Sequence, residues 1–140
     1  MPELSGLLLV TVVLALLFDF FFFFHDCANA VATVVSTRVL RPLTAVLLAG
    51  ALNIAGAFFS TAVAKMIGGG IVFPDAITNV VVAGAMAGAI CWNLFTLILG
   101  LPTSSSHALI GGLVGAAVAH GGWAVVQFKG LNKILEAMVL

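Results

Sequence analysis

The sequence predicts an all-α membrane protein with about three to five transmembrane or half-membrane helices. Of its 140 residues, 63% are apolar and only 7% are charged, whereas a soluble domain is about 45–50% apolar and about 25% charged. A bilayer core about 30 Å thick needs roughly 20 helical residues to cross it, so we expect residues 1–140 to form a single transmembrane unit. Five basic and five acidic residues without a basic cluster exclude a nucleic-acid partner.

The first apolar run covers residues 4–24, which is long enough to cross a bilayer once. It ends in five consecutive phenylalanines at positions 20–24. No positively charged segment precedes the run, so we expect a retained helix and not a signal peptide. Residues 25–42 are too polar for a lipid-facing span and too apolar for an exposed loop, which predicts a broken or buried half-helix.

Two further spans are predicted at residues 43–63 and 78–100. The second of these carries Gly84 and Gly88 at the spacing that lets membrane helices approach closely. We therefore expect this helix to pack tightly against a neighbour.

The last part of the chain predicts shorter elements. Residues 108–119 are apolar, but a helix of this length rises only about 18 Å, so a half-membrane segment is expected. Residues 129–140 place Lys133 and Glu136 beside apolar positions, as an interfacial helix or the start of another span would.

A polar stripe follows the phenylalanine run. On a helix its members project within about 80° of one another; they are Asp26, Asn29, Thr33 and Thr37. An ionisable side chain at membrane depth costs at least a few kcal/mol, so it normally faces a cavity, an ion or a partner. The stripe therefore indicates a substrate or ion path, with a polar contact to Asn53 or Asn93 on another helix as the alternative.

A second polar cluster precedes residues 108–119. Pro102 ends the preceding helix, and four residues of the type that cap helix N-termini follow, namely Thr103, Ser104, Ser105 and Ser106. The pattern predicts a helix that begins inside the membrane. Its free amides, its dipole and up to four hydroxyls suit an oxyanion without any Lys or Arg, although simple capping of a buried helix start is the alternative.

The two clusters together favour a phosphate-type ligand. Asp26 would repel a fully ionised oxyanion, but it can accept a hydrogen bond from a protonated one or share a bound cation with it. Such a ligand would travel with Na⁺ or H⁺. The candidate residues for the coupling ion are Asp26, Asn29, His25 and His107, and they leave the choice of ion open.

Other kinds of site are disfavoured. Cys27 and Cys91 lack the spacing of a metal site, and we expect neither a metal nor any cofactor besides the coupling ion. A serine hydrolase is disfavoured because Ser106 and His107 are adjacent and diverge by about 100° on a helix. We therefore do not expect an enzyme.

Two motifs resemble the inorganic phosphate transporter (PiT) family. They are residues 18–20 (FDF) with 25–38 (HDCANAVATVVSTR), and residues 100–112 (GLPTSSSHALIGG). The resemblance implies inverted repeats, phosphate symport driven by Na⁺ or H⁺, and location in the cell membrane. It further implies substrate or coupling-ion roles for Asp26, Asn29, Thr33 and the hydroxyls at positions 103–106.

The chain departs from this family in two ways. An Asn-Gly pair usually precedes Phe-His-Asp, but Phe22 and Phe23 stand there. Each motif is also present once, whereas the family joins two such halves, so the chain resembles a first repeat alone. We expect a second transporter half or another copy as its partner; the alternative is a non-transporting membrane subunit or an inactive fragment.

Overall fold

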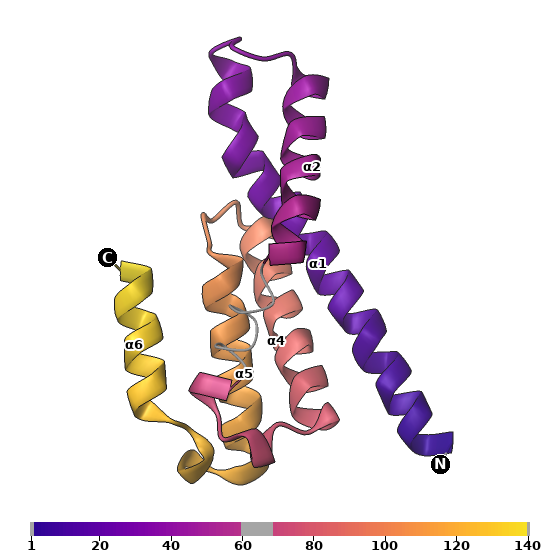
Figure 1. The fold of residues 1–140 in the computed structure, drawn as a ribbon, viewed down its shortest axis with the longest axis vertical. Coiled ribbons are helices and arrows are strands. Elements are labelled where there is room, and N and C mark those ends of the chain that lie inside the picture. Colours follow the sequence, from indigo (N-terminus) through magenta and orange to yellow (C-terminus); the bar gives the residue numbers. More distant parts are fainter. Residues whose placement is uncertain (1, 60–68, 140) are drawn as a thin grey trace.

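The fold is a set of helices, as expected for the all-α class. The computed structural model describes residues 2–59 and 69–139. Its helices are α1 (Pro2–Ser36), α2 (Pro42–Phe59), α4 (Asn79–Ile98), α5 (Ser105–Gly121) and α6 (Phe128–Val139), with short 3₁₀ turns η1 (Pro74–Ala76) and η2 (Trp123–Val125) (Figure 1). Within the described ranges no strand forms, and the extended backbone is limited to one antiparallel bridge between Val72 and Val126.

Helix α1 is continuous over 35 residues, so the predicted break after residue 24 is wrong. The physical reason is that no glycine or proline lies between Gly6 and Pro42, and phenylalanine is accommodated in a helix at modest cost. The helix ends only where Arg38 adopts a φ of 58°. There the Thr37 hydroxyl donates a hydrogen bond to the Thr33 carbonyl at 2.7 Å.

Two described helices are long and apolar enough to span a membrane, namely α1 over Ser5–Ser36 and α4. In the most apolar stretch of each helix, only 11% of α1 and 28% of α4 is buried. Such low burial argues against core helices of a soluble protein. The predicted third span is confirmed as α4. The described part of the predicted second span forms α2, and residues 60–63 lie outside the described residues.

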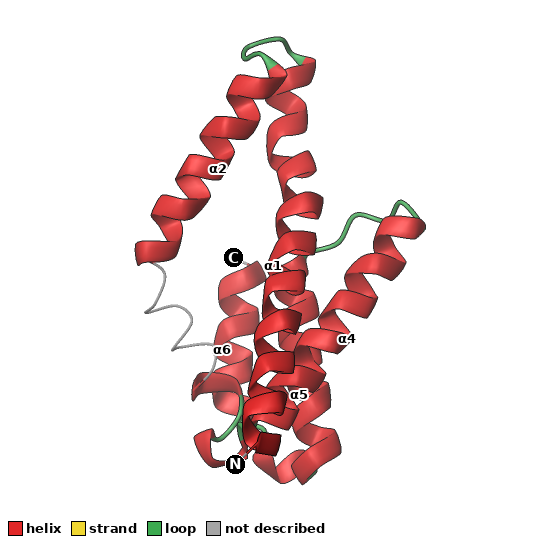
Figure 2. Ribbon diagram, turned by 90° about the vertical axis from the view of Figure 1, so that its right-hand side faces the viewer, coloured by secondary structure: helices red, strands yellow, loops and turns green. Residues whose placement is uncertain are grey.

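Helices α4 and α5 form an antiparallel hairpin (Figure 2). A Cβ built on Gly88 would meet Gly112 at 3.8 Å, and one on Gly84 would meet Ala116 at 3.3 Å, so the close contact expected at these glycines is confirmed. Helix α5 has 17 residues, not the shorter segment predicted. It is longer because it begins within the serine cluster and continues to Gly121.

Gly112 sets how closely the hairpin packs. A Cβ there would lie 2.5 Å from the carbonyl oxygen of Ala85, whereas one on Gly111 meets nothing within 4 Å. We expect Gly112→Ala to destabilise the chain by about 1–3 kcal/mol, because backbone cannot move aside as a side chain can. Thermal unfolding in detergent measures the effect, and Gly111→Ala is the control; equal melting temperatures for the two variants would contradict this packing.

Helix α1 crosses the hairpin at a compact apolar contact. Phe18 is buried there against Ala89 and Ile90 of α4 and Ala108 of α5. In a bilayer such van der Waals packing is the main force that holds helices together. The crossing therefore fixes the polar part of α1 relative to the start of α5.

Helix α6 stands beside α5, on the side away from α1 (Figure 1). Its apolar side chains Leu131, Ile134 and Met138 pack on a core cluster that includes Ile71 and Leu113. A backbone hydrogen bond joins the segment that precedes α4 to the segment that precedes α6. The main-chain N–H of Gln127 donates to the Ile71 carbonyl at 2.8 Å. Helix α6 thus docks on the hairpin through its apolar face.

Candidate functional site

The start of α5 is built as the serine cluster predicts. Ser104 is the N-cap, and its hydroxyl accepts a hydrogen bond from the His107 amide at 3.4 Å. The preceding turn passes through Gly100, whose φ of 65° favours glycine, and the Leu101 amide donates to the Thr96 carbonyl at 2.9 Å. The predicted helix start is thus confirmed.

The four hydroxyls of this turn have different surroundings. Thr103 is half-buried and accepts a hydrogen bond from the Trp92 indole nitrogen at 3.2 Å. Ser104 is used as the cap, and Ser106 is exposed. Ser105 is fully buried, and its hydroxyl has no hydrogen-bond partner among the described residues. An unpartnered buried hydroxyl is costly and therefore marks a place where a ligand, a water molecule or a moving group would be stabilised.

A cavity of about 410 Å³ lies between the polar stripe of α1 and the turn that precedes the serine cluster, and none of the four residues at positions 103–106 lines it. On α1 it is lined by Phe24, His25 and Asn29. On the hairpin it is lined by the end of α4 and the turn that follows, from Thr96 to Pro102. Figure 1 shows this turn beside the middle of α1. The volume lies in the range of small-molecule sites, so residues far apart in the sequence meet around a space that can hold a small ion.

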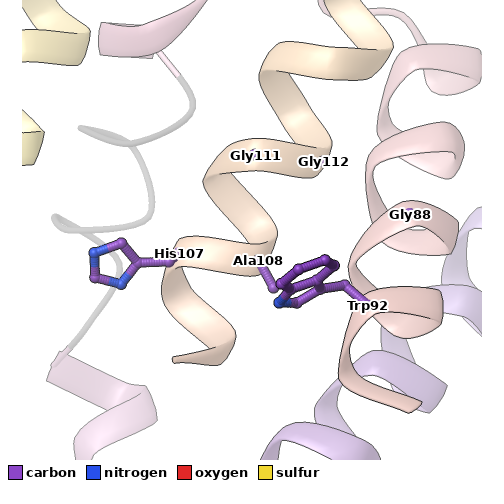
Figure 3. A pocket seen from close by; sticks show the side chains of 6 residues that line it. All are labelled: Gly88, Trp92, His107, Ala108, Gly111 and Gly112. Carbon is purple, nitrogen blue, oxygen red and sulfur yellow. The ribbon is translucent and has the colours of Figure 1, made fainter. Parts of the chain in front are cut away.

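Some predicted site residues lie outside this cavity. Asp26 is half-buried and follows His25 directly, but it does not line the cavity, and neither does the exposed Thr33. His107 lines a separate cavity of about 420 Å³ together with Trp92 and Gly88, and Figure 3 shows its imidazole pointing away from the indole. In this structure the cavity therefore contains His25 and Asn29 but not Asp26 or His107.

Asn93 is a polar residue of the hairpin that the sequence analysis treated only as a possible contact of the α1 stripe. It is 1% exposed, and neither atom of its carboxamide is hydrogen-bonded within the described residues. The register that places Gly88 opposite Gly112 brings Asn93 to the level of the first turn of α5, which contains Ser105. The sequence signal that could have identified Asn93 is its carboxamide side chain within an otherwise apolar span.

Backbone groups at the start of α5 supply partial positive charge next to this site. Among the described residues, no Lys or Arg lines the cavity between α1 and the turn. The amides of Ser105 and Ser106 lie in the first turn of α5, where no intrahelical acceptor exists, and the helix dipole adds partial positive charge. Together with hydroxyl donors these groups can hold an anion, and the Asn29 carboxamide can contribute both a donor and an acceptor.

Two apolar helices of membrane length, with a partly polar cavity beside the turn that leads into α5, are the features of a helical membrane protein with a candidate site for a small ion. The sequence model of the phosphate transporter family matches residues 23–140. The chain belongs to the phosphate transporter family, and the resemblance seen in its motifs is confirmed.

Similar proteins include several bacterial transporters. The chain is 48% identical to a "probable low-affinity inorganic phosphate transporter" of Bacillus subtilis over 142 aligned residues, which cover 100% of the chain and 43% of that protein. It is 50% identical to a protein of the same name from Streptomyces halstedii, over 96% of the chain and 63% of that protein. A "putative phosphate permease" of Pyrococcus furiosus is 34% identical over 96% of the chain and 34% of its own length.

The chain thus spans about two fifths of the length of the Bacillus subtilis relative. These relatives are named as transporters, which supports the expectation that the chain is not an enzyme. Membership of the family also assigns the chain to a membrane. No solved structure shows detectable similarity to it.

Proposed function

We propose that the chain forms one half of a transporter for inorganic phosphate. The observation that carries the proposal is the cavity in which His25 and Asn29 of α1 face the turn leading into α5. Next to this turn lie the buried, unpartnered hydroxyl of Ser105 and the free amides of the first helical turn. Phosphate would accept hydrogen bonds from these donors, and the names of the relatives support phosphate as the substrate.

The remaining predicted residues complete the proposal. These residues do not line the cavity in this structure but lie close in the sequence to residues that do, and we assign them to substrate binding in states that bring them to the ion; they are Asp26, Thr33, Thr103, Ser104 and Ser106. Asp26, Asn29, His25 and His107 are the candidates for coupling to Na⁺ or H⁺. Transport would be symport across the cell membrane.

A second half is part of the proposed assembly. Many transporters place the substrate at the interface of two inverted repeats near the middle of the bilayer. Asn29, Ser104 and Ser106 are exposed in the isolated chain, so this face is open to a partner. We propose a second repeat, or another copy of the chain, as that partner.

Uptake of labelled phosphate tests the proposal. The chain would be produced together with the part of the Bacillus subtilis relative that it does not cover, and reconstituted in lipid vesicles. We expect Asn29→Ala and Ser105→Ala each to lower uptake about tenfold or more, because a hydrogen bond to a charged group contributes about 1.5–3 kcal/mol.

Thr44→Ala serves as the control, because Thr44 is exposed on α2 and lines none of the cavities described above. It removes a hydroxyl without touching the proposed site, so its uptake should equal that of the unchanged chain. Unchanged uptake in both Asn29→Ala and Ser105→Ala would reject the site. Absence of phosphate uptake by the unchanged, correctly folded assembly would instead favour a non-transporting subunit.

A further inference from the structure

Three buried polar side chains lie in the part of the α4–α5 hairpin that adjoins the proposed phosphate site. They are Asn93, which is 1% exposed, Thr96, which is 2% exposed, and Ser105, which is 0% exposed. Thr96 also lines the cavity that we assign to phosphate, whereas Asn93 and Ser105 do not. A polar cluster thus begins at the wall of this cavity and continues into the hairpin.

The helical periodicity places Asn93 and Ser105 on faces that meet. On α4, Ala85, Ala89 and Asn93 follow one another at intervals of four residues and share one face. On α5, Ser105 and Gly112 are seven residues apart, so they also share a face. A Cβ on Gly112 would meet the backbone of Ala85 and Ala89, so these two faces are in contact. Because the helices are antiparallel, two turns along each from this contact bring Ser105 to the level of Asn93.

The polar atoms of Asn93 and Ser105 have no partner. Neither the carboxamide of Asn93 nor the hydroxyl of Ser105 makes a hydrogen bond within the described residues. Thr96 differs from them, because its hydroxyl donates to the carbonyls of Trp92 and Asn93, each at 3.0 Å. An unpaired buried donor or acceptor lowers stability. The hairpin therefore carries two buried polar side chains that weaken its packing, which a purely structural role does not explain.

The two side chains can be satisfied together with a bound anion. The carboxamide of Asn93 has two N–H donors, and a serine oxygen can accept one hydrogen bond while its own O–H donates another. A hydrogen bond from Asn93 to the Ser105 oxygen therefore leaves the Ser105 O–H free to donate to phosphate. The reverse bond, from Ser105 to the Asn93 carbonyl, would take this donor away from the ion.

We propose that Asn93 is a positioning residue for phosphate binding, which donates a hydrogen bond to the Ser105 oxygen and thereby directs the Ser105 O–H toward the ion. This role rests on the proposed phosphate transport, and it gives Asn93 no contact with the ion itself. The atoms that are unpaired in this structure are then the atoms that become paired when phosphate binds. Replacing Asn93 should weaken phosphate binding without weakening the fold.

The concentration dependence of phosphate uptake tests this role in the vesicle assembly described above. Asn93→Leu keeps the branched shape of the side chain and removes its polar atoms. We expect the phosphate concentration for half-maximal uptake to rise about tenfold, with a maximal rate within about twofold of the unchanged assembly. Asn93→Ala, a smaller side chain, should give the same rise. Asn53→Leu is the matched control, because Asn53 is an exposed amide on α2, and it should change neither quantity. An unchanged half-maximal concentration in both Asn93 variants would overturn the proposal.

Combining Asn93→Leu with Ser105→Ala shows whether Asn93 acts through Ser105. We expect uptake by the double variant to match that of Ser105→Ala within about twofold, because without the hydroxyl Asn93 has nothing to position. Losses that multiply in the double variant would show that the two residues act independently, and would overturn the positioning role.

Thermal unfolding of the assembly in detergent separates positioning from a structural role. Without phosphate, Asn93→Leu should melt no lower than the unchanged assembly, since it removes buried polar atoms that have no partner. A lower melting temperature would show that the amide holds the hairpin together, and would overturn the proposal. Added phosphate should raise the melting temperature of the unchanged assembly and of Asn53→Leu, but raise that of Asn93→Leu less.

The same measurements distinguish this inference from the proposed function. If phosphate neither enters vesicles through the unchanged assembly nor raises its melting temperature, the proposed function fails and the positioning role fails with it. If the unchanged assembly takes up phosphate and the Asn93 variants behave as Asn53→Leu does, the positioning role alone fails.

Discussion

Replacing Gly130 with alanine is expected to detach α6 from the rest of the chain. A Cβ at this position would overlap the carbonyl oxygen of Gly70. The nearest atoms all belong to the Gly70 backbone, so no side chain can rotate away to relieve the overlap. Overpacking usually costs about 1–3 kcal/mol and occasionally more. The overlap of this Cβ with Gly70 is more severe than that of a Cβ on Gly112 with Ala85. We therefore expect the free energy of docking of α6 to weaken by more than about 3 kcal/mol.

Limited trypsin digestion measures this detachment. Lys129 and Lys133 lie on α6, and cleavage after them should become faster in Gly130→Ala because an undocked helix opens more readily. Gly115→Ala is the control, since a Cβ on Gly115 meets nothing within 4 Å. Equal cleavage rates for Gly130→Ala and Gly115→Ala would contradict the close passage of these two backbone segments.

Replacing Phe18 with alanine is expected to have the other large effect, on both stability and transport. Phe18 is buried where α1 crosses the hairpin, and removal of a buried phenylalanine ring typically costs about 3–5 kcal/mol. The crossing holds His25 and Asn29 beside the turn that precedes α5. We therefore expect phosphate uptake to fall at least tenfold even where the variant still inserts into vesicles, since misplacing binding groups by about 1 Å can cost about a hundredfold.

Phe58→Ala is the matched control for this experiment. It removes the same ring from a position on α2 that is 80% exposed, so stability and uptake should change little. Detergent melting and labelled phosphate uptake measure both variants in parallel. Uptake by Phe18→Ala equal to that of Phe58→Ala would show that the helix crossing does not position the site.

Short-range chemistry made much of the fold predictable. Ser104 caps α5 because its hydroxyl accepts a backbone amide, and such local bonds can be read from neighbouring residues. The close packing at Gly84 and Gly88 follows from side-chain size in the same way. Polarity alone misled the interpretation of residues 25–42, because the absence of glycine and proline lets α1 continue to Ser36.

The arrangement of the site was less predictable, because it depends on how helices cross. The sequence analysis expected Asp26 at the site, but the rotation of α1 at the crossing turns His25 and Asn29 toward the cavity instead. Asn93 reaches the level of the first turn of α5 only through the register of the hairpin, which no local pattern specifies. Asp19 and Asn53 likewise line the same cavity only through the pairing of α1 with α2.

Protection of cysteine labelling by phosphate tests the shared cavity most directly. Phe24 on α1 and Leu101 in the turn both line it, and neither is assigned to phosphate binding. Each would be changed to cysteine after replacement of Cys27 and Cys91 by alanine, and labelled with a small thiol reagent. We expect phosphate, but not chloride, to slow labelling at both positions with the same half-maximal concentration. Phosphate protection at one position only, or at neither, would contradict a single site formed by α1 and the start of α5.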